Sequence, residues 1–313
     1  MSFNAAQASG YVIGVAKPAS WTSHDAVVCV RRALGERRVG HTGTLDPFAT
    51  GLLLCCVGRA TKLSGYLMDF TKEYEGAMLF GVRTSSGDID GEVLEDREVP
   101  LPSVDRLIET ARGFQGEIEQ VPPMVSALKH EGQRLYQLAR RGIVVDRPAR
   151  KVFVESFDIL EAGGRRIRFR VRCARGTYVR TLVEDFGARL GATACVEQLC
   201  RTRVGSFRVE DAVDLEREPV AEQLRSRAVS MAQALDNLPS WRIPSFWARK
   251  LREGHAPPWS AIEVDREPSD GEIGRLLGAS GDLVALGKAV ATPGAGDRPW
   301  IDALSMELLR VFV

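Results

Sequence analysis

Residues 40–53 read GHTGTLDPFATGLL, and this stretch carries most of what the sequence says about fold and chemistry. A single acid, Asp46, stands among small and hydroxylated residues, and the strand-like apolar run LLLCCVG follows. The glycines let the backbone bend and come close to a partner, while Pro47 biases Asp46 towards an extended conformation. A carboxylate on such a loop is a candidate nucleophile or base. Taken alone, an Asp-Pro pair more often caps a turn.

Bulk composition is that of an ordinary globular protein. The chain has 313 residues, 44% hydrophobic and 27% charged, with a formal net charge of +1. This length suits one large domain or two. The six cysteines form no C-x-x-C and the four histidines have no metal-ligand spacing, so we expect reduced thiols and no metal. The start lacks a signal-peptide pattern and no apolar run is long enough to span a membrane, which predicts a cytoplasmic protein.

Charge is distributed unevenly along the chain. Residues 85–119 carry ten acids against three arginines, whereas residues 163–183 carry seven arginines and no acid. In the second segment the arginines alternate with apolar residues, which is the period of a strand with one basic face. A solvated face is the ordinary explanation of a charge run. A face made entirely of arginine instead predicts an anionic partner, and basic segments can contact phosphates.

The periodicity predicts an α+β fold, because strands and helices mix without strict βαβ alternation. Thr22 to Asp25 form a helix start of capping-box type, and Gly35 ends that helix. Ala162-Gly163-Gly164 joins two strands as a hairpin. Further segments expected are a strand at 11–18, a long strand at 72–84, a helix near 132–141, a helix from Thr177 to Gly191, and a mostly helical stretch at 205–240.

Five motifs together resemble the bacterial tRNA pseudouridine synthase B family. They are GHTGTLDPFATGLL, KEYEG, PPMVSALKHEGQRLYQLARRG, ARGTYVRTL and QLCRTRVGSF, in the family's order over roughly residues 11–208. One short motif would be weak evidence, but five in order are strong. Two positions depart from the pattern. Ser20 stands where the family usually has glycine, and Cys200 stands where arginine is common.

The resemblance implies a particular fold and substrate. It implies a catalytic domain at 1–240 with the pseudouridine synthase fold, whose central mixed or antiparallel sheet is flanked by helices. A small β-rich domain at 241–313 would resemble a PUA RNA-binding domain. The implied reaction is isomerisation of uridine 55 in the T-loop of tRNA, without cofactor or metal. The uridine must leave the stack to be reached. The expected partner is the tRNA T-arm, and a monomer is our default.

The resemblance also assigns site residues. It implies that Asp46 is the nucleophile and that Arg180 pairs with it. Such a bidentate pair would lower the pKa of the carboxylate. Tyr74 would stack on the uracil and is the candidate base for the C5 proton, although a phenol with a pKa of about 10 is a poor base at neutral pH. Tyr178 and Leu199 would line the uridine pocket.

Further residues are expected to bind RNA. By resemblance, His41 contacts the opened T-loop and Lys17 either supports the active-site loop or binds phosphate. A mobile RNA clamp is expected at 124–151. Its phosphate-binding residues would be Lys129, Arg134, Arg140 and Arg141.

Two other functions remain open at this point. The first is a tRNA-binding or tRNA-folding protein of the same fold without chemistry, which would be indifferent to the loss of Asp46. The second is a carboxylate-dependent hydrolase such as a glycosidase. Glycosidases usually need two carboxyls facing one bond. The acids at 88–98 lie in a turn-rich segment that we expect to be solvated, which disfavours this alternative.

Overall fold

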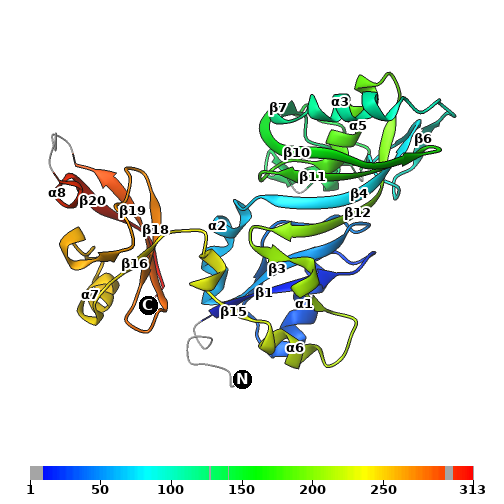
Figure 1. Cartoon of the computed structure of the whole chain (residues 1–313). Coiled ribbons are helices and arrows are strands. Elements are labelled where there is room, and N and C mark those ends of the chain that lie inside the picture. The colour runs from blue at the N-terminus through cyan, green and yellow to red at the C-terminus, as the bar shows by residue number, and fades with distance from the viewer. Residues whose placement is uncertain (1–9, 127, 140, 293–298, 313) are drawn as a thin grey trace.

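The computed structural model describes residues 10–126, 128–139, 141–292 and 299–312, without the side chains of Lys129 and Tyr136. A large mixed sheet with helices forms the main body, and a smaller sheet stands beside it at the C-terminal end (Figure 1). This confirms the expected α+β fold.

In the described residues, eleven strands form the main sheet. Its path is β14-β1-β3-β12-β4-β11-β10-β7, with β2, β13 and β15 paired off that path. The pairs β1–β14 and β12–β3 are parallel and the others are antiparallel. The strands are β1 (Gly10–Lys17), β2 (Val39–His41), β3 (Thr50–Gly58), β4 (Lys72–Phe80), β7 (Gly116–Gln120), β10 (Arg150–Gly163), β11 (Arg166–Cys173), β12 (Ala194–Val204), β13 (Phe207–Arg208), β14 (Val213–Asp214) and β15 (Val229–Ser230).

The first helix begins and ends as the sequence predicts. The Thr22 hydroxyl accepts from the Asp25 amide at 3.1 Å, and the Asp25 carboxylate accepts from the Thr22 amide at 2.8 Å. Gly35 adopts φ 67°, which ends the helix. The helices are α1 (Ser23–Leu34), α2 (Ser64–Met68), α3 (Val104–Arg112), α4 (Leu135–Ala139), α5 (Val179–Arg189), α6 (Val220–Ser226), α7 (Ser245–Lys250) and α8 (Trp300–Ala303).

Four phenylalanines anchor α5 against the sheet. The ring of Phe157 lies 5.8 Å from that of Phe169 and 5.4 Å from that of Phe186 between centroids, and Phe114 completes the cluster. Phe157, Phe169 and Phe186 are fully buried. Each such side chain contributes about 1.5–3 kcal/mol through burial. The cluster therefore fixes the helix whose first turn carries Arg180.

The hairpin of β10 and β11 forms as predicted. The arginines of its basic face pair with glutamates of the protein itself, which strands β4, β10 and β12 supply, and an external anionic partner for this face stays a prediction. The ion pairs are Arg166–Glu197 (2.6 Å), Arg168–Glu161 (3.2 Å), Arg170–Glu75 (2.6 Å) and Arg172–Glu155 (3.4 Å).

Two segments differ from the expected elements. Residues 205–240 were expected to be mixed and mostly helical, but they hold one short α-helix, α6, two 3-10 helices (Val209–Asp211 and Gln233–Leu235) and the short strands β13 to β15. The long strand expected at 72–84 stops at Phe80. Gly81 has φ 85° and turns the chain into β5 (Val82–Thr84), which pairs with β6 (Val93–Asp96) instead of the main sheet.

The smaller sheet packs directly on the main body. Its order is β17-β16-β18-β19-β20. Phe312 belongs to the same apolar cluster as Leu54, and its carbonyl accepts from Arg59 Nη1 at 3.0 Å. The strands are β16 (Ser240–Arg242), β17 (Glu263–Val264), β18 (Ile273–Leu277), β19 (Leu283–Ala291) and β20 (Leu304–Val311).

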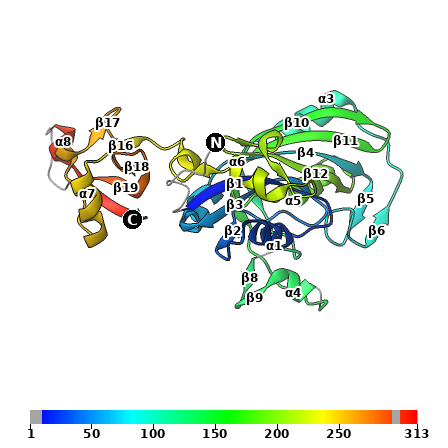
Figure 2. The same cartoon turned by 90° about the horizontal axis from the view of Figure 1, so that it is seen from below.

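The segment expected to be an RNA clamp projects from the body. Figure 2 shows β8 (Lys129–His130), β9 (Gln133–Arg134) and α4 standing away from the main sheet. Arg147 Nη1 donates to the Pro122 carbonyl at 3.0 Å, which joins the two ends of the segment at its base. None of the helices in the described ranges is long and apolar enough to cross a membrane.

Candidate active site

The loop that carries Asp46 runs from β2 to β3 and is fixed by hydrogen bonds at the residues just before the acid. The Leu45 amide donates to Ser23 Oγ at 2.8 Å, and that hydroxyl also lies 3.2 Å from the Leu45 carbonyl. The Gly43 carbonyl accepts from Arg201 Nη2 at 3.1 Å. Ser23 and Arg201 are buried, so these bonds are shielded from water. The backbone around Asp46 is thereby held in one conformation.

Lys17 supports this loop from beneath. Its ammonium donates to the carbonyls of Pro18 (2.8 Å), Trp21 (2.7 Å) and Pro47 (3.2 Å), and the side chain is only 1% exposed. Burial lowers the pKa of Lys17 to about 8, against the opposing effect of the Asp46 carboxylate. Of the two roles expected for Lys17, loop support fits this geometry. The phosphate-binding role does not, because the ammonium is enclosed and its three donors are used.

Ser20, which departs from the family pattern, is strained. It has φ 67°, in the left-handed region that glycine adopts without steric cost. Its amide donates to the Pro47 carbonyl at 2.9 Å, so the strained turn is also bonded to the Asp46 loop. This conformation gives a physical reason for glycine at this position in the family pattern.

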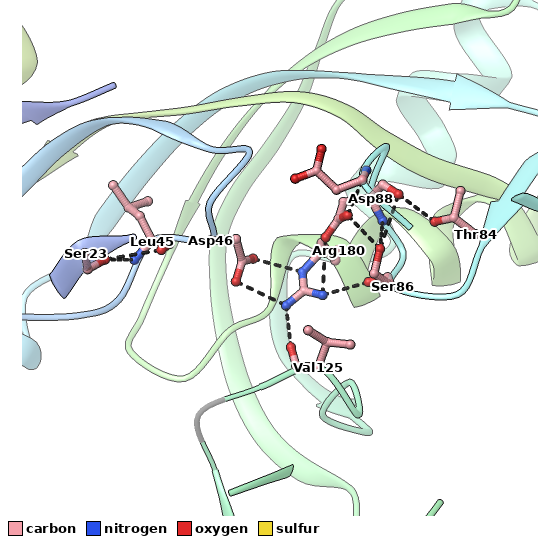
Figure 3. A network of polar contacts seen from close by, with 9 residues as sticks. Ser23, Leu45, Asp46, Thr84, Ser86, Asp88, Val125 and Arg180 are labelled. Carbon is pink, nitrogen blue, oxygen red and sulfur yellow. Dashed lines mark hydrogen bonds and ion pairs between the residues drawn. The ribbon is translucent and has the colours of Figure 1, made fainter. Parts of the chain in front are cut away.

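Arg180 joins Asp46 to two other segments (Figure 3). Its Nε lies 2.9 Å from Asp46 Oδ2 and its Nη2 lies 3.3 Å from Asp46 Oδ1. Nη2 also donates to the Val125 carbonyl, and Nη1 donates to the Ser86 carbonyl, both at 2.7 Å. Nη1 lies 3.4 Å from Asp88 Oδ2. With Arg180 only 2% exposed, the carboxylate of Asp46 has a fixed orientation.

The pKa of Asp46 differs from the sequence-based expectation. A lowered pKa was expected from the pairing with Arg180, but burial raises the pKa of Asp46 above its ordinary value. Arg180 opposes this effect and the negative charge of Asp88 adds to it. Arg180 therefore orients the carboxylate and lowers its pKa, but the effect of burial is the larger of the two.

Asp88 is a site residue that sequence reasoning missed. We expected the acids at 88–98 to be solvated, but Asp88 is only 4% exposed. Its Oδ1 accepts from Ser86 Oγ at 2.6 Å and from the Asp90 amide at 3.2 Å. It lies on the far side of Arg180 from Asp46 (Figure 3). The turn-forming run SSGD was the signal for a structured loop, but it gave no indication of burial.

A cleft of about 450 Å³ opens over Asp46. That volume suits a single nucleotide or part of one. The cleft brings together four of the predicted site residues beside Asp46, together with residues that were not predicted. The predicted members are Tyr74, Tyr178, Arg180 and Leu199, and the others include Lys72, Ser126, Arg150, Arg175 and Arg201.

Tyr74 lies in the cleft, but its environment does not favour a role as base. Burial raises the pKa of the Tyr74 phenol, while the positive charge of Arg201 partly opposes this. A phenol whose pKa lies above 10 is ionised even less at neutral pH than a free tyrosine. The stacking role expected for Tyr74 stays a prediction.

The start of α5 presents both Tyr178 and Arg180. Gln120, at the end of β7 and 2% exposed, fixes the backbone there. Its Oε1 accepts from the Tyr178 amide at 3.0 Å, and its Nε2 donates to the Tyr178 carbonyl at 3.3 Å. Leu199 is 7% exposed and forms part of the opposite wall on β12. These contacts position the side chains that border Asp46.

Several expected RNA-binding residues lie elsewhere. Among the described residues, His41 is not part of the cleft lining. Burial lowers its pKa, and its Nδ1 is buried without a hydrogen-bond partner in the described part of the chain. Arg134 and Arg141 are exposed on the projecting segment. The side chain of Lys129 and the whole of Arg140 lie outside the described residues.

Lys72 and Arg201 are further cleft residues that were not predicted. Lys72 is 6% exposed, and its ammonium donates to the carbonyls of Met68 and Phe70. Burial lowers the pKa of Lys72 to about 8. Strand alternation was the available signal, because Lys72 lies two residues before Tyr74 and Arg201 two residues after Leu199. In the residues that the structure describes, no cluster of three His, Cys, Asp or Glu side chains could hold a metal ion.

Comparison with known proteins gives two matching family models. Residues 31–179 match the TruB family pseudouridylate synthase (N terminal domain), and residues 180–238 match the tRNA pseudouridylate synthase B C-terminal domain. The tRNA pseudouridine synthase B of Nitrosococcus oceani is 40% identical over 277 residues, covering 87% of this chain and 88% of that protein. The same enzyme of Pseudomonas putida is 48% identical over 268 residues, covering 85% and 86%.

Solved structures agree with these matches. A Cbf5–Nop10–Gar1 complex contains a chain with a TM-score of 0.74 and 27% identity, which covers 97% of this chain and 85% of that one. The cleft carboxylate paired with a buried arginine, on this sheet and with these relatives, defines the class as pseudouridine synthases, which are isomerases. Within that class, the chain belongs to the tRNA pseudouridine synthase B family.

Proposed function

We propose that this protein isomerises uridine 55 in the T-loop of tRNA to pseudouridine, with Asp46 as the nucleophile. The observation that carries the proposal is the carboxylate of Asp46, held by the buried Arg180 at the base of a cleft of nucleotide size. The relatives named tRNA pseudouridine synthase B support tRNA as the substrate. The order and spacing of the motifs around Asp46 support the same position in tRNA.

The reaction needs few chemical groups. The N1–C1′ bond of the uridine breaks, the uracil turns, and a bond forms between C5 and C1′. Asp46 would attack C1′, attack C6 of the ring, or take a proton from the sugar. In each route the carboxylate must be oriented and ionised, and Arg180 provides the orientation. Because the pKa of Asp46 is raised, its carboxylate needs a higher pH than an ordinary aspartate to be ionised.

The C5 proton must leave after the new bond forms. The raised pKa of Tyr74 makes its phenolate a rare species at neutral pH. We therefore assign the removal of this proton to water or to the Asp46 carboxylate once it has been released. Tyr74 keeps its proposed place against the flipped uracil. Tyr178 and Leu199 would complete the pocket around the base.

Cations that line the cleft and an adjoining cavity suggest the path of the RNA. Arg150 is exposed and lines the cleft. Arg310, on β20, is exposed and lines a neighbouring cavity of about 450 Å³ together with Lys62 and Arg175. Arg175, which pairs with Asp69, borders both cavities, so the two adjoin. A phosphate backbone that follows these cations would pass from the cleft to the smaller sheet.

The remaining proposals concern partners and organisation. Residues 241–313 would form a PUA-like RNA-binding domain and residues 1–240 the catalytic domain. The T-arm would be held by the clamp at 124–151, with Lys129, Arg134, Arg140 and Arg141 on phosphates and His41 against the opened loop. The protein would act as a monomer in the cytoplasm, without metal or cofactor.

The test uses an unmodified tRNA transcript incubated with the purified protein. Pseudouridine is mapped by carbodiimide treatment and primer extension, and a transcript with cytidine at position 55 serves as the control. We expect one stop, at position 55, which the control lacks. Binding without any stop would indicate a tRNA-binding protein, and release of free uracil would indicate a hydrolase.

A further inference from the structure

Helix α5 begins without a capping side chain of its own. Tyr178, its N-cap residue, gives no side-chain hydrogen bond to the first turn in the part of the chain that the structure describes. That turn carries Arg180, whose Nε has to meet Asp46 Oδ2 at 2.9 Å. The backbone groups at an uncapped helix start need other partners. Here a partner comes from a strand of the main sheet.

That partner is Gln120, the last residue of β7. Its Oε1 accepts from the Tyr178 amide at 3.0 Å, and its Nε2 donates to the Tyr178 carbonyl at 3.3 Å. A primary amide carries an acceptor and a donor side by side, so it can pair with both backbone groups of one residue, as a neighbouring strand would. Since Gln120 is buried, water does not compete for these bonds. Gln120 therefore fixes the residue at which α5 begins.

The chain that follows Gln120 reaches α5 a second time. Five residues further on, the Val125 carbonyl accepts from Arg180 Nη2 at 2.7 Å. This stretch is also the first leg of the clamp at 124–151, which leaves the main sheet at the end of β7. One short segment is thus bonded both to the start of α5 and to the side chain of Arg180. It gives the clamp and the Asp46–Arg180 pair a common support.

We propose that Gln120 is a positioning residue, which sets the direction in which the first turn of α5 presents Arg180 to Asp46. The inference rests on the proposed function, in which Asp46 is the nucleophile. A carboxylate that is already oriented does not have to be ordered during the reaction, which lowers the barrier. Among the described residues, Gln120 is not part of the cleft lining, so it acts through Arg180 and not on the RNA.

Gln120→Met keeps the length of the side chain and removes both hydrogen bonds. We expect it to lower kcat for tritium release from C5-labelled tRNA by about tenfold, because Arg180 loses its fixed direction but keeps its bond to the Ser86 carbonyl. KM should stay within about twofold, since Gln120 does not bind the RNA. Gln120→Glu keeps the acceptor for the Tyr178 amide and should lose less.

A matched control lies at the other end of the same strand. Gln115 is exposed and immediately precedes β7. Gln115→Met makes the same chemical change without removing a hydrogen bond to α5. Its kcat and its pH profile should be those of the wild type.

The pH profile separates positioning from mere support of the fold. Burial raises the pKa of Asp46, and Arg180 is the largest opposing effect. A looser contact with Arg180 leaves the pKa of Asp46 higher, so the acid limb of the kcat/KM profile should move to higher pH in Gln120→Met. The charged and ionisable groups around Asp46 are Arg180 on α5, Asp88 between β5 and β6, Lys17 on β1, Tyr74 on β4 and Tyr178.

The acid limb therefore decides the inference. An acid limb that stays at the wild-type pH in Gln120→Met, with or without a loss of kcat, would overturn it. Gln120 would then support the fold without orienting Arg180.

A double-mutant cycle with Gln120→Glu keeps the inference testable if Gln120→Met does not fold. In the Arg180→Lys background, Gln120→Glu should lower kcat much less than it does in the wild type, because both changes act on one contact. Additive losses would overturn the inference. If the wild type itself releases no tritium, the proposed function fails instead, so the two failures are distinguishable.

Discussion

At the scale of single residues, Ser20 shows how a departure from a family pattern becomes a physical cost. Its φ of 67° is a conformation that costs a non-glycine residue roughly 1 kcal/mol, and it lies in the turn that bonds to the Asp46 loop. The sequence identified the unusual residue. The sign of its backbone angle was needed to say what the departure does.

Ser20→Gly is therefore expected to stabilise the protein. The free energy of unfolding should rise by up to about 1 kcal/mol, because the left-handed strain disappears while the greater freedom of glycine in the unfolded chain offsets part of the gain. Urea unfolding measures the change. Ala19→Gly, in the same turn without a positive φ, is the control and should be neutral or destabilising. A Ser20→Gly protein no more stable than the Ala19→Gly protein would contradict this account.

Asp88 affects Asp46 through charge. It raises the pKa of Asp46, so removing its charge should lower that pKa. The reaction needs the ionised carboxylate, so the acid limb of the kcat/KM profile should move to lower pH in Asp88→Asn. The value of kcat should also fall, because Arg180 loses a partner that helps to fix it.

A matched control is available in the same loop. Asp90 is exposed and contributes its amide, not its carboxylate, to the hydrogen bonds of Asp88. Asp90→Asn should leave both the pH profile and kcat close to those of the wild type. An acid limb that is identical in Asp88→Asn and the wild type would show that Asp88 has no electrostatic effect on the nucleophile.

For single residues, sequence reasoning correctly predicted which side chains pair in the site. It did not predict how burial and neighbouring charges change the pKa of Asp46. The resemblance implied the pairing of Asp46 with Arg180, and the structure shows it. The direction of the Asp46 pKa could not be obtained in the same way. It depends on burial and on Asp88, which lies 42 positions away and reaches the site only through the folding of the β5–β6 segment.

At the scale of elements, the β10–β11 hairpin shows what periodicity can and cannot predict. The alternation of arginine with apolar residues correctly predicted one strand with a basic face, β11, and Ala162-Gly163-Gly164 correctly predicted its hairpin with β10. The alternation could not identify the glutamates opposite, because cross-strand neighbours depend on the order of strands in the sheet. Glu75 and Glu197 come from β4 and β12, far from the hairpin in sequence.

These ion pairs predict that the arginines of the hairpin contribute less to tRNA affinity than an unpaired arginine at the cleft. Arg168→Gln should leave tRNA affinity nearly unchanged, because Arg168 already pairs with Glu161. Arg150→Gln should weaken binding and reduce the slope of log K against log salt by about 1, because an exposed cleft cation would be lost. Binding is measured by filter retention over a range of salt concentrations. Equal losses in the two variants would place RNA on the arginine face of the sheet as well.

The boundaries of an element were predicted correctly where the local sequence signals were strong. The capping box and Gly35 gave both ends of α1, since a helix end is determined by hydrogen bonds within a few residues. The stretch at 205–240 had no such signals. Its strands β13 to β15 are two residues each and form only because β1 and β12 offer them an edge.

At the scale of the whole molecule, the smaller sheet has an apolar core of its own and shares a second apolar cluster with the main body. Phe312 and Leu286 share an apolar cluster with Leu54, and Arg59 and Lys62 donate to carbonyls of its last strand and the residue beyond. The sequence indicated a β-rich unit after Pro239. It gave no indication of this contact, because neither side is unusual in composition.

Phe312→Ala tests whether Phe312 holds the smaller sheet against the main body. Phe312 is 2% exposed, so its truncation should lower the free energy of unfolding by about 3–5 kcal/mol. Phe246, on helix α7 of the same C-terminal region but 53% exposed, is the control, and Phe246→Ala should change stability by no more than about 0.5 kcal/mol. Thermal unfolding of both variants measures the difference. Similar losses in the two would mean that Phe312 does not hold the sheets together.

The central claim is that Asp46 is the nucleophile of an isomerase. The most direct test is tritium release from tRNA labelled at C5 of uridine, comparing the wild type with Asp46→Asn at equal tRNA occupancy. The account predicts release of one tritium per tRNA by the wild type and none by Asp46→Asn, with tRNA still bound by both. Release by Asp46→Asn at the wild-type rate, or no release by a wild type that binds tRNA, would contradict it.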